Sequence, residues 1–199
     1  VSIHYDPMIA KLIVHGPDRT TALQRLAAAL DATRIVGPSN NVAFLARVAR
    51  HAAFAAGEID TGFIARHKAD LVPARGPAPD ETLALAALAV VRARADAALA
   101  AEPLSPWSHA QGWRLNGDAH DDLAFKDGAN EVALRVHYRP GGYAIETPGG
   151  TIEAKAALSK DGHLIATLDG RKLEADVVRR GLDIVVFLGA AATPLTLID

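Results

Sequence analysis

The most distinctive feature of the hydrophobic pattern is a stretch near the middle of the chain that is apolar at every position. Residues 83–91 are all Leu, Ala or Val. The pattern predicts a helix over 80–101, with Asp80 as its N-cap and Pro103 preventing its continuation. Because such a helix has no polar face, we expect it to be buried on several sides. Its expected core side chains are Leu83, Leu85, Leu88 and Val91.

Short segments separated by turn signals follow this helix to the end of the chain. Val132, Leu134 and Val136 alternate with other residues, and pairs such as Asp169-Gly170 supply the positive φ of tight hairpin turns. A meander of antiparallel strands removes its open edges by closing into a barrel. The predicted strands span 121–126, 130–138, 142–147, 150–158, 163–168, 171–180, 182–188 and 193–198.

A barrel of eight strands encloses a space that side chains or one ligand can fill. The apolar part of the helix matches that space in length and polarity. We therefore expect the sheet to surround the helix, with a helix lying across an open barrel mouth as the alternative. The apolar run is too short for the ~20 residues of a membrane-spanning helix.

The first part of the chain mixes predicted helices, about 19–32 and 42–50, with two strand-like segments at 8–15 and 34–36. Two short strands are marginal alone. We therefore expect this part to have its sheet partners in preceding sequence, so that the chain is a piece of a longer polypeptide. We also expect residues 1–79 to be less well ordered than residues 80–199.

Composition narrows the function classes. The chain has 199 residues, half of them hydrophobic, and a net charge of −2, with neither half forming the basic footprint of a nucleic-acid or anionic-lipid binder. The absence of cysteine excludes disulfides and thiolate catalysis and suits a reducing cytosol. No signal peptide pattern is found.

No pattern predicts a catalytic, cofactor-binding or metal-binding residue. The eight histidines include no pair two to four positions apart, so we interpret them as scattered surface or strand residues. The Gly-Gly pairs at 141–142 and 149–150 lie between predicted strands, which favours hairpin turns over phosphate loops. No Gly-x-Ser-x-Gly sequence frames a nucleophile.

An ordered set of short matches resembles a known family. Residues 3–67 resemble the end of the biotin carboxylase C-terminal domain in α subunits of acyl-CoA carboxylases, and the ending 60–64 is closest to the 3-methylcrotonyl-CoA carboxylase branch. Residues 105–107 and 112–117 resemble the start of that branch's BT domain, in which the biotin carboxylase and carboxyltransferase interact. The matching segments of the first part are 5–13, 18–19, 36–37, 41, 44–45 and 60–64.

The resemblance implies an α+β fold. Residues 1–69 would be part of a biotin carboxylase domain, 70–79 a linker, and 80–199 a long helix surrounded by an eight-stranded antiparallel β-barrel. It also implies a parent ligase that uses ATP, magnesium and biotin to carboxylate an acyl-CoA, with 3-methylcrotonyl-CoA of leucine catabolism favoured over propionyl-, acetyl- or geranyl-CoA.

Within that parent, this piece would itself carry no cofactor and no catalytic residue. Biotin is attached to a lysine between methionines, and the one methionine here, Met8, is not part of such a motif. The implied role is a scaffold in a hetero-oligomer, contacting the carboxyltransferase β subunit and other α-subunit domains, without nucleic acid or membrane. The partner-contacting residues, in the loop that follows the helix, would be Leu104, Trp107 and His109.

Two further expectations follow. The family and the missing cysteine lead us to expect a bacterial cytoplasmic protein. The alternative function is a small-ligand-binding β-barrel of the lipocalin kind, which would need an empty apolar interior.

Overall fold

The structure is a computed structural model that describes residues 8–105 and 118–198. Its contacts divide the chain into two compact units. The first contains residues 1–76 with 189–191, and the second contains residues 77–188 with 192–199.

The first unit is helical in its described residues. Asp18 caps the first helix by accepting a hydrogen bond of 2.7 Å from the Thr21 backbone N–H. A small core forms between the first two helices, where Leu30, Val42 and Ala46 are buried. The helices are α1 (Arg19–Asp31), α2 (Val42–Arg50), α3 (Ala52–Ala56), α4 (Phe63–Arg66) and α5 (Lys68–Leu71).

The two strands predicted in this unit are wrong. Neither residues 8–15 nor residues 34–36 form a strand. Met8 and Ile13, expected in a mostly buried strand, are 57% and 79% exposed. The apolar residues favour a buried strand, but a strand also needs a neighbouring strand to complete its backbone hydrogen bonds.

The second unit begins with α6 (Asp80–Ala101), which has the predicted bounds. Its N-cap is Pro79, so the expectation that Asp80 is the cap is wrong. Asp80 and Glu81 lie in the first turn, where the positive end of the helix dipole stabilises their carboxylates. Every residue from Thr82 to Val91 is buried, so the helix lacks a water-facing side over this length.

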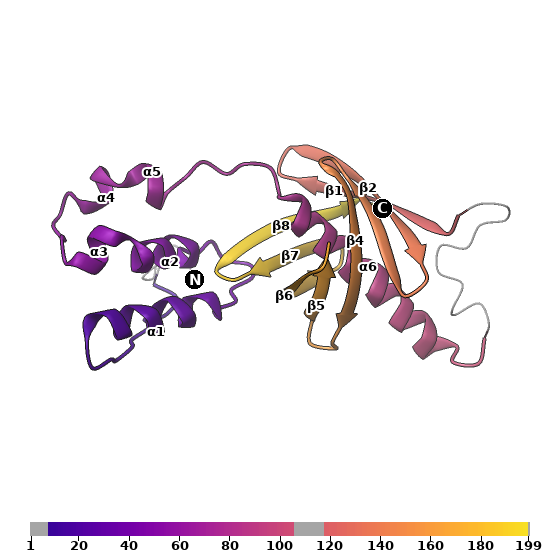
Figure 1. The fold of residues 1–199 in the computed structure, drawn as a ribbon, viewed down its shortest axis with the longest axis horizontal. Coiled ribbons are helices and arrows are strands. Elements are labelled where there is room, and N and C mark those ends of the chain that lie inside the picture. The colour runs from indigo at the N-terminus through magenta and orange to yellow at the C-terminus, as the bar shows by residue number, and fades with distance from the viewer. Residues whose placement is uncertain (1–7, 106–117, 199) are drawn as a thin grey trace. The chain divides into compact units, whose positions relative to one another are not determined.

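Eight antiparallel strands form a closed barrel in sequence order (Figure 1). The predicted strand ends agree with the observed ones to within two residues. The strands are β1 (His120–Asp127), β2 (Asn130–Arg139), β3 (Gly142–Thr147), β4 (Gly150–Leu158), β5 (His163–Leu168), β6 (Arg171–Arg180), β7 (Asp183–Leu188) and β8 (Ala191–Ile198).

The pairing register places one apolar face of every strand against α6. Phe125 of β1 lies opposite Val132 of β2 and Leu197 of β8, which closes the barrel. Several inward positions are small, including Ala154, Ala166 and Ala175, and α6 is itself rich in alanine. The thin helix and these small strand residues together allow a barrel of eight strands to close around a helix, which confirms the predicted fold class.

Hairpin turns at one end of the barrel fix the start of α6. The Asp127 carboxylate accepts a hydrogen bond of 2.7 Å from the Ala78 N–H, and Arg171 Nη1 lies 2.7 Å from Glu81 Oε1. A Cβ atom at Gly149 would lie 2.0 Å from an Asp80 carboxylate oxygen, so a larger residue in that turn would require the Asp80 side chain to move. The later turns of α6 therefore leave the barrel at its other end.

We predict that Leu88→Asp unfolds the barrel unit, because Leu88 is 0% exposed and an unpaired carboxylate would enter the core. Leu88→Ala should lower the free energy of unfolding by about 2–5 kcal/mol. Leu99 lies on the same helix but is 43% exposed, so Leu99→Asp should change stability by less than about 0.5 kcal/mol. Urea unfolding followed by circular dichroism measures all three, and a folded Leu88→Asp chain would contradict the buried helix.

We also predict faster amide hydrogen exchange in residues 8–79 than in residues 80–105 and 118–198. Residues 8–16 have no regular hydrogen-bonded structure, whereas the barrel strands are paired along both edges. Mass spectrometry of exchanged peptides provides the measurement. Equally slow exchange in both parts would show that the first unit is as stable as the barrel.

Candidate functional site

The exposed end of α6 is the first candidate for a binding surface. Ala95 is the last buried residue of the helix, and Leu99 further along is 43% exposed. Leu104, just beyond the helix, is 98% exposed. The other two residues predicted to contact a partner, Trp107 and His109, lie outside the described residues.

The residues predicted to fill the barrel lie in its core. Leu85 and Leu88 are 0% exposed, and Leu83 and Val91 are 2% and 1% exposed. Because these side chains occupy the space between the strands, the barrel interior is filled where a lipocalin-type ligand would bind. Binding surfaces are therefore to be sought outside the barrel core.

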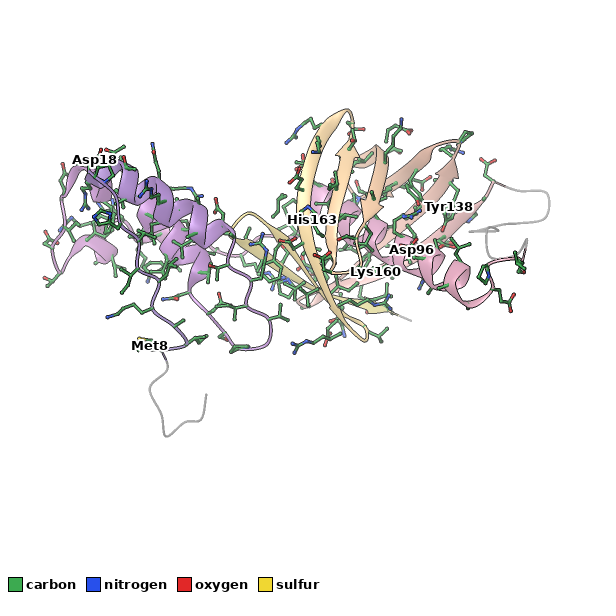
Figure 2. The ribbon with its side chains drawn as sticks, turned by 90° about the horizontal axis from the view of Figure 1, so that it is seen from below. Met8, Asp18, Asp96, Tyr138, Lys160 and His163 are labelled. Atoms are coloured by element: carbon green, nitrogen blue, oxygen red, sulfur yellow. The ribbon has the colours of Figure 1, made fainter. Side chains whose placement is uncertain are left out.

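A groove of about 660 Å³ lies where α6 leaves the barrel, between the helix and the β4–β5 turn. Ala89, Val90 and Ile184 contribute apolar surface to it. Asp96 of α6 and Lys160 of the β4–β5 turn also line it, and both are labelled in Figure 2. The groove thus combines an apolar floor with charged side chains of both signs.

Tyrosine and acidic side chains lie near the same end of the barrel. The Tyr138 hydroxyl donates a hydrogen bond of 2.9 Å to Asp121 (Tyr138 is labelled in Figure 2). Burial, and then this hydrogen bond, raise the pKa of Tyr138 well above its usual value. Tyr143 packs against it with a ring-centroid distance of 5.6 Å and is itself only 8% exposed. This arrangement orders the barrel wall rather than preparing a tyrosine for proton transfer.

A histidine on the barrel wall forms an ion pair. His163 Nδ1 of β5 lies 2.9 Å from Asp176 Oδ1 of β6, its neighbour across the two strands. The hydrogen bond to Asp176 raises the pKa of His163 above its usual value of 6.5. The pair is partly exposed, so it adjusts the pH dependence of stability and is not a catalytic site.

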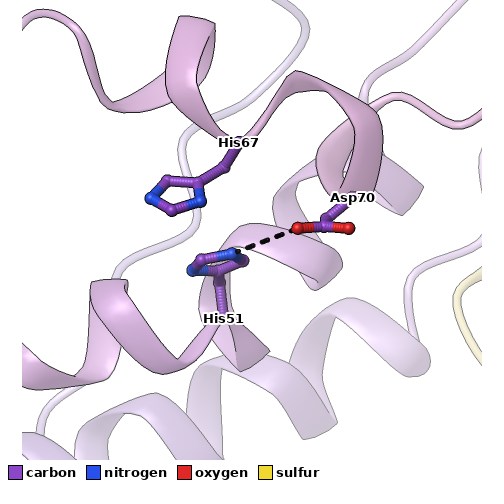
Figure 3. A group of neighbouring side chains, drawn as sticks. All are labelled: His51, His67 and Asp70. Carbon is purple, nitrogen blue, oxygen red and sulfur yellow. Dashed lines mark ion pairs between the residues drawn. The ribbon is translucent and has the colours of Figure 1, made fainter.

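The first unit contains a cluster that the sequence pattern did not reveal. His51, His67 and Asp70 each offer one potential metal-ligand atom, and these atoms all lie within 4.8 Å of one another (Figure 3). The two histidines are sixteen positions apart, so a search for closely spaced histidines passes over them. Both histidines directly follow a helix, His51 after α2 and His67 after α4, but this position alone does not indicate that the two side chains meet.

Comparison with known families decides what this arrangement of helix and barrel is. The profile of the family described as "Methylcrotonyl-CoA carboxylase, alpha-subunit, BT domain" matches residues 79–199, which is more than half of the chain. The chain belongs to this family. The "Biotin carboxylase C-terminal domain" profile matches residues 1–66, so the two profiles together cover nearly all of the sequence.

Individual relatives agree with this family assignment. The mitochondrial methylcrotonoyl-CoA carboxylase subunit alpha of Dictyostelium discoideum is 38% identical over 172 residues, covering 86% of this chain and 24% of that protein. The Rattus norvegicus subunit alpha is 35% identical over 82% of this chain and 24% of its own length. The mitochondrial propionyl-CoA carboxylase alpha chain of Homo sapiens is 50% identical, but over only 32% of this chain and 9% of its own. The chain thus spans about a quarter of the methylcrotonoyl-CoA carboxylase subunits that it matches.

The comparison corrects one expectation. A bacterial cytoplasmic location is wrong, because the methylcrotonoyl-CoA carboxylase relatives, from animals, plants and Dictyostelium, are mitochondrial proteins. The cysteine-free composition behind that expectation is compatible with more than one compartment, so it could not distinguish between them. Within the described ranges, no helix is long and apolar enough to cross a membrane.

We predict that the pKa of His163 lies above 6.5 and that it falls back towards 6.5 in the Asp176→Asn variant. Because the folded-state pKa is the higher one, the pair stabilises the fold fully below the pKa of the unfolded chain. That contribution is lost as the pH rises through the folded-state pKa. The stability difference between wild type and His163→Gln should therefore shrink from pH 5.5 towards pH ~9. NMR titration of the imidazole and urea unfolding give the two readouts, and a difference that grows with pH would contradict the assignment.

Proposed function

We propose that this chain is the part of a methylcrotonyl-CoA carboxylase α subunit that joins its biotin carboxylase domain to the carboxyltransferase β subunit. In this proposal residues 1–69 are the C-terminal part of the biotin carboxylase domain and residues 70–79 are a linker. Residues 80–199 are the interaction domain. The family membership over both parts of the chain supports this division.

The observation that carries the proposal is the contrast between the two halves of α6. The first half is enclosed by the barrel, whereas the second half ends in the exposed residues 97–101, which are four alanines and one leucine. Such apolar surface beyond the end of a closed core is typical of a contact with another protein. Leu99 and Leu104 are the described residues that offer the most apolar surface there, and Trp107 and His109 belong to the same proposed interface.

The parent enzyme of this proposal uses ATP, magnesium and biotin, and the residues of this chain do not fit those groups. Met8 is the one methionine, so no lysine lies between two methionines as biotin attachment in the family requires. The barrel glycines with positive φ, such as Gly128, Gly170 and Gly181, lie in turns between strands and not before a helix that could hold a phosphate. The role that we propose for this chain is therefore structural and not catalytic.

We predict that immobilised chain retains its cognate carboxyltransferase β subunit at micromolar concentration. Leu99→Asp combined with Leu104→Asp should weaken this binding about tenfold or more, because a few central apolar residues dominate the free energy of most interfaces. Ile165→Asp is the matched control, since Ile165 is 39% exposed on β5 and lies neither on α6 nor in the segment that follows it. Circular dichroism establishes that each variant is folded.

Two results would contradict this function. The first is no retention of the β subunit by the folded wild-type chain. The second is equal weakening by Ile165→Asp and by the double variant, which would place the interface elsewhere on the barrel.

A further inference from the structure

We propose that His51, His67 and Asp70 form a binding site for one divalent transition-metal ion, with Zn²⁺ as the best fit. The site lies within the first unit, on the described residues alone, and is independent of the proposed contact with the β subunit. Its role is to hold α5 and the end of α4 against the junction of α2 and α3.

The local fold places the three side chains on separate structural elements that meet in space. His51 lies between α2 and α3, His67 between α4 and α5, and Asp70 within α5. The two imidazole rings lie 4.2 Å apart between centroids, inclined by 53°. Phe63, which is only 4% exposed, contacts both rings at centroid distances of 5.4 and 5.0 Å. This packing restricts both imidazoles before any ion binds.

The two ring nitrogens of His51 have different surroundings. Its side chain is only 16% exposed, and its Nδ1 is buried without a hydrogen-bond partner among the described residues. Its Nε2 lies 3.8 Å from Asp70 Oδ2, which is longer than a hydrogen bond (Figure 3). Nε2 is thus the nitrogen that faces Asp70, and an ion shared with His67 and Asp70 would bind there and leave Nδ1 unchanged.

The geometry suits a small divalent cation after a short movement. In a tetrahedral zinc site with bonds of about 2.0–2.1 Å, the ligand atoms lie about 3.4 Å apart. The three candidate atoms lie within 4.8 Å, and the Asp70 side chain is 73% exposed and free to rotate inward. The histidines, held by Phe63, need to move least.

The donor set selects the class of metal. Two imidazoles and one carboxylate are ligands for zinc and neighbouring transition metals, whereas magnesium and calcium prefer sites made of oxygen atoms. Three protein ligands leave the fourth position to water, and the exposure of Asp70 gives solvent access to it. We therefore expect Zn²⁺ or Co²⁺ to bind and Mg²⁺ to bind far more weakly.

The test uses the full chain without any histidine tag, and the metal ion alone as probe. Isothermal titration with Zn²⁺ should give one ion per chain at micromolar or tighter affinity, and Co²⁺ should produce the visible absorption of a tetrahedral or five-coordinate ion. Zn²⁺ should also slow amide exchange in residues 51–71, because the ion links the helices that carry its ligands.

Variants with matched controls assign the site. His67→Gln and Asp70→Asn should each weaken Zn²⁺ binding about tenfold or more. His137→Gln and Asp176→Asn make the same changes in His–carboxylate pairs of the barrel and should leave the affinity unchanged. Asp70 is exposed, so Asp70→Asn remains informative even if His67→Gln fails to fold.

The outcomes separate clearly. Loss of binding in Asp70→Asn with retention in Asp176→Asn supports the site. The proposal is overturned if the wild-type chain does not bind Zn²⁺, if Asp70→Asn binds as tightly as wild type, or if the barrel variants lose the ion instead.

Discussion

The burial of one apolar helical segment is the constraint on which the second unit depends. From Leu83 to Val91, α6 has no side that could face water, so it is stable only where protein surrounds it completely. The eight strands supply that surface, and the helix in turn fills a barrel that would otherwise contain a large void. Neither part is a folded structure without the other, because each provides the apolar surface that the other needs.

The same arrangement determines where the protein can interact. With the core occupied by α6, recognition is left to the outer surface and to the end of the helix that leaves the barrel. The turns around Asp127, Gly149 and Arg171 hold the opposite helix end in place. The exposed end is consequently carried on a rigid element, which reduces the ordering that a contact there would require.

The barrel could be predicted from the sequence almost residue by residue, because its signals are local. Turn pairs such as Asp169-Gly170, both with positive φ, set the hairpins, and alternation along strands such as β2 indicates which face is buried. The first unit was harder, since the apolar residues around Met8 and Ile13 favour a buried strand, whereas both side chains are exposed and no strand forms there. The cluster of His51 and His67 was missed for another reason. Their contact depends on how short helices pack, and no spacing rule contains that information.

The order of the elements along the chain has a consequence for synthesis. The helix precedes all eight strands, and the barrel closes through the pairing of β1 with β8, the last strand. During translation the apolar segment therefore leaves the ribosome long before its enclosure can be completed. Until Leu197 can reach Phe125, residues 83–91 remain accessible to chaperones or to other chains. A chain truncated within β8 would keep almost all of this sequence and still leave α6 open on one side.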